Sequence, residues 1–395
     1  MPSRTDRIKG ALDLLAQRFE NRFVAFPGAP NCVGWGQFLD GPQDHAQLGL
    51  YGTCAGMMVR ALAGRQRDAL HQQATNLLRH WWGQPDARTA SKLTQIPRLA
   101  FLHLALRVAG EAGFADEVAQ RLRAELLPGG LYADVSVAEA PGGTPRVLPT
   151  GMTLASFALR RGREAQRNNW CCELANRLGE LLPGHERLSL LEFALGTLGV
   201  VSESSRIPQP LKRRLRTIAN RGPLPLEDFG VYFLEYRDRQ DGAAPRRDYF
   251  IAPTTLVLGL SGLSKNAPGA LRVRSDEIVD AVVKNVEKNQ AFVPGTGDRI
   301  SSKNQAWAAL LLGTRADGSL PLFGRVWYAL RKYRRDNWFT GALLPLIGYM
   351  VATVGAVYTE GALKAIPAMG GLVMGGIYPI KRVFDRILGR SDESI

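Results

Sequence analysis

Residues 50–58 have the sequence Leu-Tyr-Gly-Thr-Cys-Ala-Gly-Met-Met, and the pattern of these nine residues is the strongest indication of the fold. It holds no charge, and small or apolar side chains occupy most faces of the helix that it predicts. A helix that is apolar all round must be buried on all sides. The same order of a loop, a small or hydroxyl residue and an apolar run begins near residues 51, 94, 150, 189, 254 and 304. We therefore recognise six units, spaced about 40 to 65 residues apart.

Each unit is followed by a more charged stretch, and five of these have an amphipathic pattern: 66–82, 115–127, 164–182, 211–219 and 275–289. Apolar helices alternating with helices that keep one wet face are what a closed ring of helical hairpins requires. The sequence therefore predicts an all-α fold, an (α/α)6 toroid of six hairpins with an inner and an outer ring, over residues 1–337. The alternative is an irregular helical domain whose helices are similar by coincidence.

Two segments resemble the repeat of the prenyltransferase and squalene/terpene cyclase toroids. One runs from Gly34-Trp35-Gly36-Gln37 through 45–53, and the other joins the loop 290–295 to the helix start 302–307. The resemblance covers roughly residues 10 to 335 and implies a central cavity faced by the starts of the inner helices. The chain lacks the DxDD acid motif of class II cyclases, an Asp/Cys/His zinc trio and the QxxxGxW repeats. The resemblance thus favours the fold and disfavours the chemistry of that family.

The last part of the chain has the pattern of a membrane segment. Residues 339–358 carry no charge, and twenty helical residues span about 30 Å, the thickness of a bilayer core. A second apolar stretch covers 365–380, and basic residues flank the pair on both outer sides. We expect 338–395 to form a transmembrane helical hairpin whose ends and toroid both face the cytoplasm at the inner membrane. A single span with an interfacial segment, or two buried core helices, are the alternatives.

The charge composition indicates which classes of partner the chain is expected to bind. Lys and Arg number 50 against 36 Asp and Glu, so the net charge is +14, and the densest basic run, 331–335, adjoins the apolar tail. This placement favours anionic lipid headgroups over nucleic acid, for which no recognition motif occurs. Glycines at the four-residue spacing of Gly371 and Gly375 suit helix–helix contact, so the hairpin is a candidate for homo-oligomerisation.

Several other classes find no support in the sequence. The four cysteines show neither a disulfide framework nor metal-ligand spacing, so we expect reduced cysteines and no metal. The first ten residues lack the apolar core of a signal peptide. There is no Walker loop and no GxGxxG at a strand–helix turn, so we expect no cofactor.

Polar residues in the loops that enter the inner helices are the site candidates. Asp44 and His45 form a possible acid/base pair, or a helix-capping arrangement. Glu227 and Asp228 are two carboxylates that could act on a glycoside, although consecutive residues seldom straddle a substrate. The predicted ligand-binding residues are Tyr51, Thr53, Tyr232, Asp298, Lys303 and Asn304.

Two functions remain open at this point. The first is a non-catalytic toroid that senses an unknown small ligand, tethered to the membrane, in the layout of bacterial stress or antiphage (antiviral defence) effectors. The second is a membrane-associated enzyme that processes a terpenoid, a prenyl chain or a glycan.

Overall fold

The computed structural model describes residues 3–66, 68–85, 90, 92–158, 173–174, 177, 232–236, 246–250, 269–294 and 299–313. All of them belong to one compact unit, Met1–Gly318. The elements are α1 (Arg4–Glu20), β1 (Val24–Ala25), β2 (Val33–Gly34), the short 3-10 helix η1 (His45–Gln47), α2 (Leu50–Leu62), α3 (Ala69–Gly83), α5 (Ile96–Ala109), α6 (Ala112–Ala124), α7 (Val147–Ala158), β3 (Tyr232–Tyr236), β4 (Arg246–Phe250), α12 (Gly269–Asn289) and α13 (Ser302–Gly313).

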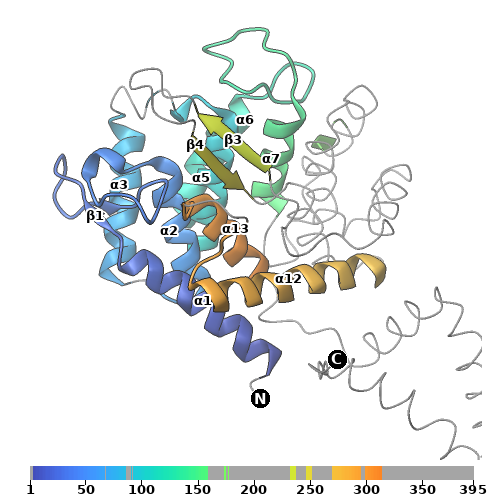
Figure 1. Cartoon of the computed structure of the whole chain (residues 1–395). Coiled ribbons are helices and arrows are strands. Elements are labelled where there is room, and N and C mark those ends of the chain that lie inside the picture. Colours follow the sequence, from blue (N-terminus) through green and yellow to red (C-terminus); the bar gives the residue numbers. More distant parts are fainter. Residues whose placement is uncertain are drawn as a thin grey trace, which may run out of the picture. The chain divides into compact units, whose positions relative to one another are not determined.

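Helices α13, α2, α5 and α7 form a consecutive inner row, each packed against the next (Figure 1). Eleven of the 13 residues of α2 are buried, as its all-round apolar pattern predicts. Helices α13 and α2 are about 250 residues apart in sequence. Their contact joins the last described part of the unit to the first, as the closing of a ring requires.

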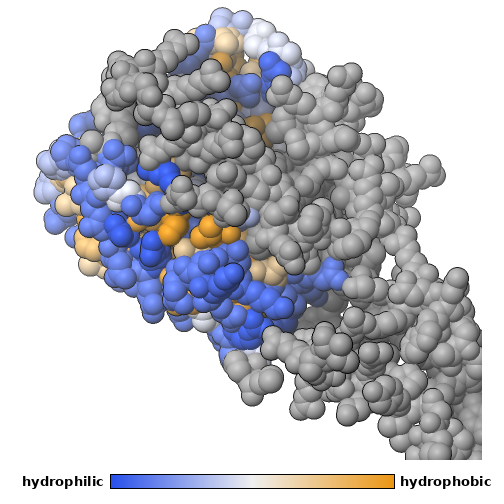
Figure 2. Space-filling view, in the orientation of Figure 1, coloured by the Kyte–Doolittle hydropathy of each residue, from blue (hydrophilic) through white to orange (hydrophobic). Residues whose placement is uncertain are grey.

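The helices between these inner ones are amphipathic. In α1 the buried residues Ile8, Leu12, Leu15 and Phe19 recur at the three- and four-residue spacing of one helix face. Its other face is hydrophilic, and the described surface over α1 and α12 in Figure 2 is mainly hydrophilic as well. Helix α1 packs against α2, α12 and α13, so it covers the place where the inner row closes.

Four of the six predicted units coincide with inner helices. The predicted starts near 51, 94, 150 and 304 correspond to α2, α5, α7 and α13, which begin at residues 50, 96, 147 and 302. The starts near 189 and 254 lie outside the described residues. The described part of the chain is mostly helical. The predicted domain boundary between residues 337 and 338 also lies outside the described residues.

The prediction of a purely helical fold needs a correction, because two antiparallel β-hairpins are present. In one, β1 pairs with β2, and in the other β3 pairs with β4, with Tyr232 opposite Phe250 and Tyr236 opposite Arg246. Aromatic residues are frequent in β3 and β4, and such residues favour strands. The first hairpin lies in the segment that connects α1 to α2.

No helix in the described part of the chain has the length and apolarity needed to cross a bilayer. The predicted hairpin, at 338–395, lies outside that part.

Candidate functional site

A buried tryptophan fixes the loop that enters the first inner helix. Trp35 is fully buried, and its indole N–H donates to the carbonyl oxygen of Phe19 at 2.7 Å. Its backbone N–H donates to Oγ1 of Thr53 at 3.4 Å. The loop lies so close to α2 that a Cβ on Gly52 would overlap the backbone and one on Gly56 would overlap the indole ring. Glycine at these two positions therefore allows the loop to rest on the helix start.

The same kind of contact, between a polar side chain of the helix and the backbone of a buried aromatic residue, recurs at two other inner helices. In α7, Thr150 accepts from the backbone N–H of the buried Tyr132 at 3.1 Å. In α13, the buried Gln305 accepts from the N–H of Phe292 and donates to its carbonyl oxygen, both at 2.7 Å. A polar side chain near the helix start thus holds an aromatic residue of the preceding loop. This contact explains why a hydroxyl or amide residue opens the repeating unit.

The loop after Trp35 also joins the first inner helix to the last. Ser302, at the start of α13, donates from its hydroxyl to the carbonyl oxygen of Gly36 at 2.6 Å and from its N–H to that of Gln37 at 2.9 Å. The N–H of Leu39 donates to the carbonyl oxygen of Ile300 at 2.8 Å. These bonds hold the two helix starts together and build one wall of a cavity.

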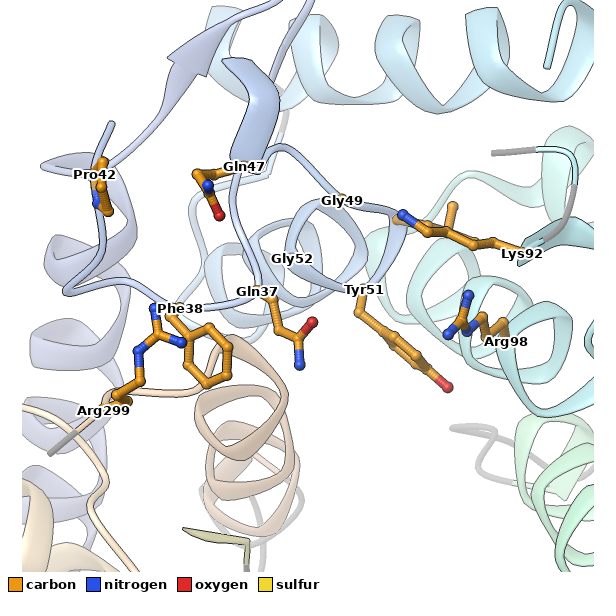
Figure 3. A pocket seen from close by; sticks show the side chains of 11 residues that line it. Gln37, Phe38, Pro42, Gln47, Gly49, Tyr51, Gly52, Lys92, Arg98 and Arg299 are labelled. Carbon is orange, nitrogen blue, oxygen red and sulfur yellow. The ribbon is translucent and has the colours of Figure 1, made fainter. Parts of the chain in front are cut away.

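The cavity has a volume of about 360 Å³ and lies at the N-terminal ends of α2 and α5, beside the loop that precedes α13 (Figure 3). That volume is within the range of small-molecule sites. The described residues that line it are Gln37, Phe38, Pro42, Gln47, Gly49, Leu50, Tyr51, Gly52, Lys92, Arg98 and Arg299. None of these eleven is acidic.

Tyr51 stands at the centre of a set of cations and aromatic rings. The guanidinium carbon of Arg98, from α5, lies 5.6 Å from the centre of its ring. The ammonium nitrogen of Lys303, from α13, lies 5.5 Å from the same point. Behind Tyr51, the ring centre of Phe101 lies 5.2 Å from that of Tyr51 and 5.6 Å from that of Trp307, and both pairs of rings pack edge to face. Burial, together with the positive charge of Arg98, lowers the pKa of Lys303.

On the other side of the cavity, Arg299 covers the ring of Phe38, with its guanidinium carbon 3.7 Å from the ring centre. Lys92, in the segment before α5, completes the lining (Figure 3). Cations therefore reach the cavity from two separate parts of the chain. No group of three or more His, Cys, Asp or Glu side chains that could hold a metal ion occurs among the described residues.

The structure distributes the predicted site residues unevenly. Tyr51 lines the cavity, and Lys303 approaches its ring. Thr53 is fully buried and bonded to Trp35, and Asn304 is 1% exposed. Neither of these two is among the described lining residues, because the first turn of a buried inner helix turns only part of its side chains to the cavity.

Asp44 and His45 contact each other, with an oxygen-to-nitrogen distance of 3.0 Å, and their side chains are 52% and 62% exposed. They lie in the loop that enters α2, outside the lining of the cavity. Such an exposed pair matches the capping and hydrogen-bonding alternative more closely than an acid/base pair aimed at a substrate.

Other candidates have no described side chain. Glu227, Asp228 and Asp298 lie outside the described residues, and Tyr232 is described only as the first residue of β3, through its backbone pairing.

Of the eleven lining residues, only Tyr51 was predicted from the sequence. The ten others include the polar and aromatic side chains of Gln37, Phe38, Gln47, Lys92, Arg98 and Arg299. One feature of the sequence could have indicated Arg98 as a site residue. Pro97 marks the start of α5 and so places Arg98 in its first turn, where the helix dipole disfavours a cation. Lys303 holds the same unfavourable position in α13. A basic residue in the first turn of an otherwise apolar helix is thus worth testing as part of a site.

The fold defined by this row of inner helices and its amphipathic cover is that of the α/α toroids. The α-1,6-mannanase GH76A of Salegentibacter sp. HEL1_6, an (α/α)6 toroid, is similar to the chain with a TM-score of 0.50 and 13% identity over 78% of this chain and 99% of the mannanase. Two inactive variants of that enzyme, with α-1,6-mannotriose or α-1,6-mannotetrose bound, give TM-scores of 0.49 at 12% identity, over 78% of this chain and 99% or 98% of theirs.

At this identity the similarity establishes a common fold and nothing finer. No protein-family profile matches the chain, and no curated protein sequence matches it. The toroid prediction is therefore confirmed at the level of the α/α fold. The resemblance to prenyltransferases and terpene cyclases in particular is not confirmed by these comparisons.

Proposed function

We propose that the chain is a glycan-processing toroid that binds a saccharide in the cavity at the starts of α2 and α5. The observation that carries this proposal is the lining itself. Amide side chains of Gln37 and Gln47, the Tyr51 side chain and the guanidinium of Arg98 converge on one space of about 360 Å³. A few polar groups around a partly aromatic cavity are the usual way to orient a small ligand rich in hydroxyls.

The mannanase that shares the fold acts on an α-1,6-linked mannan, and this supports a glycan over an isoprenoid as the ligand class. An isoprenoid would require a mainly apolar cavity, since each buried methylene is stabilised by transfer out of water. The lining here holds three cationic and two amide side chains. The chemistry of the described residues thus disfavours an uncharged terpenoid or prenyl chain as the ligand.

Catalysis, in this proposal, falls to the acidic candidates Glu227 and Asp228. Glycoside hydrolysis requires a proton donor and a second carboxylate, which acts as base or nucleophile. The proposal also keeps the membrane tether at 338–395, which would hold the toroid beside a membrane-associated glycan.

The test uses the full-length chain in detergent with α-1,6-mannotriose and related oligosaccharides. We expect calorimetric binding, and release of new reducing ends that Glu227→Gln or Asp228→Asn abolishes. Asp116→Asn and Glu117→Gln change a second pair of consecutive acids, exposed on α6, and should leave release unchanged.

Two other results would redirect the proposal. Saccharide binding with no cleavage of any substrate would favour the ligand sensor over the enzyme. Absence of saccharide binding would remove the proposal altogether. Membrane fractionation of a chain that ends at residue 337 tests the tether separately, because the truncated chain should leave the membrane fraction.

A further inference from the structure

The wall of the cavity that carries Gln37 and Phe38 is held by the segment that leads into α13. The carbonyl oxygens of Gly36 and Gln37 accept from the hydroxyl and the N–H of Ser302, at 2.6 and 2.9 Å. The next residue, Phe38, pairs with Ser301 through an antiparallel bridge. The backbone of three consecutive residues is thus fixed, so the side chains of Gln37 and Phe38 enter the cavity from fixed points.

The Gln37 side chain is exposed, lines the cavity and forms no hydrogen bond with any other residue that the structure describes. Figure 3 shows its amide between the side chains of Phe38 and Tyr51. A side-chain amide carries N–H donors beside a carbonyl acceptor, whereas a lysine or arginine side chain can only donate. The Gln37 amide can therefore donate to one hydroxyl group of a sugar while it accepts from the adjacent one.

The side chain of Phe38 supplies an apolar surface next to this amide. The guanidinium carbon of Arg299 lies 3.7 Å from the centre of the Phe38 ring, so the cation covers one face of the ring and helps to fix its orientation. The ring is half-buried and lines the cavity, so part of its surface is open to a ligand. A pyranose has C–H groups on its faces and hydroxyl groups around its edge. The ring and the amide together match both kinds of surface.

We infer that Gln37 and Phe38 together bind one pyranose unit, and that Gln37 determines the specificity of the site. The Gln37 amide binds two adjacent hydroxyl groups at the edge of the sugar, and Phe38 packs against C–H groups of one face. This inference rests on the proposed function and assigns the specificity of that same site. A site that hydrogen-bonds a hydroxyl group discriminates against an analogue that lacks it, because the protein group then loses its partner.

The experiment begins with calorimetric titrations of the full-length chain in detergent with the methyl α-glycosides of mannose, glucose and galactose. The glycoside that binds most tightly is then compared with its monodeoxy analogues, each of which lacks one hydroxyl group. We expect the loss of either of two adjacent hydroxyl groups to weaken binding to the wild type about 3- to 10-fold. The loss of a hydroxyl group elsewhere on the ring should weaken binding less.

Variants of Gln37 show whether its amide causes these two penalties. In Gln37→Leu both penalties should shrink to less than about twofold, because the variant side chain has no polar group to lose a partner. In Gln37→Glu the carboxylate accepts but does not donate, so only one of the two penalties should remain.

A variant of Phe38 separates affinity from specificity. Phe38→Leu should weaken binding of the glycoside and of all its analogues by the same factor, about 3- to 10-fold, because it removes the flat aromatic surface and leaves the amide in place. Gln120→Leu makes the same substitution as Gln37→Leu at an exposed position of α6. This control should change neither the affinity nor the penalties.

The possible failures distinguish this inference from the proposed function. Penalties that are equal in the wild type and in Gln37→Leu overturn the inference and leave the saccharide proposal standing. Binding of α-1,6-mannotriose without binding of any methyl glycoside has the same consequence, because the site would then require more than one sugar unit. Absence of binding by all three glycosides and by α-1,6-mannotriose overturns the saccharide proposal, and the inference with it.

Discussion

The two ends of α2 use positive charge in opposite ways. At its C-terminal end, Arg60 is 1% exposed and forms ion pairs with Glu20 and Asp68. At its N-terminal end, Lys92 and Arg98 line a cavity whose described lining contains no acid. A cation is favourable at the end of a helix and unfavourable at its start. The charge of Arg60 therefore contributes to the stability of the fold through its ion pairs, whereas Lys92 and Arg98 contribute to the lining of the cavity.

Neutral groups hold the N-terminal ends instead. Thr53, Thr150 and Gln305 bind the backbone of Trp35, Tyr132 and Phe292, respectively. A cationic cavity is therefore compatible with a stable fold, because the hydrogen bonds that position the helix starts do not involve the cations.

The largest effect is expected at the C-terminal end of α2. Arg60→Met removes a buried guanidinium and leaves the carboxylates of Glu20 and Asp68 with fewer partners. We expect the free energy of unfolding to fall by about 3–4 kcal/mol, measured by urea denaturation. Arg79→Gln, at an exposed ion pair with Glu117, should cost under about 1 kcal/mol. Equal losses in the two variants would contradict the structural role of Arg60.

A smaller loss is expected from the packing of the loop on the start of α2. Gly52→Ala places a methyl group against the carbonyl oxygens of Trp35 and Gly36, both of them backbone atoms. We expect a loss of about 2–3 kcal/mol in the free energy of unfolding. Gly113→Ala, in α6, meets no atom within 4 Å and should stabilise by about 0.5–1 kcal/mol. If both substitutions stabilise the protein, the loop does not lie on α2 as described.

Loss of the two hydrogen bonds between Gln305 and the backbone of Phe292, near the start of α13, should have an intermediate to small effect on the free energy of unfolding. Gln305→Met keeps the length of the side chain and leaves the buried N–H and carbonyl of Phe292 without their bonds. We expect a loss of about 2 kcal/mol. The measurement is again urea denaturation, with the exposed Gln290→Met as the control. A loss of stability smaller than that of the control would mean that the hydrogen bonds of Gln305 do not position the start of α13.

Much of the fold could be predicted from periodicity, and the exceptions have physical reasons. Helices α2, α5, α7 and α13 are apolar on most faces, so the sequence shows where they begin to within three residues. The helix α1 was not assigned, although its capping box, formed by Ser3 and Asp6, and its amphipathic spacing are both visible in the sequence. The β-hairpins were missed because their strands are short and depend on pairing with each other rather than on a local pattern.

The site was harder to predict, because it depends on closure of the ring. Tyr51 and Lys303 could be selected from loop position, yet nothing in the sequence shows that Arg98 and Lys303 approach the same ring from different helices. The bond from Ser302 to Gly36 spans 266 residues, and such a contact has no local signature. Thr53 was selected for the same positional reason as Tyr51, but its hydroxyl turns to Trp35 instead.

The smallest effect is expected at Lys303, and its sign is opposite to that of Arg60. Burial and Arg98 lower the pKa of Lys303 below its ordinary value of 10.5, so the folded state binds its proton less tightly than the unfolded state does. The electrostatic cost is complete below the folded pKa and is relieved as the pH rises from that value to 10.5. Lys303→Met should therefore raise the melting temperature by about 2 °C at pH 7, and the gain over the wild type should shrink as the pH approaches 10.5. Lys288→Met, at an exposed position of α12, should show no such pH-dependent gain. A melting temperature that falls at pH 7 would mean that the Lys303 ammonium stabilises the fold as Arg60 does, and the contrast between the two ends of the inner helices would then be lost.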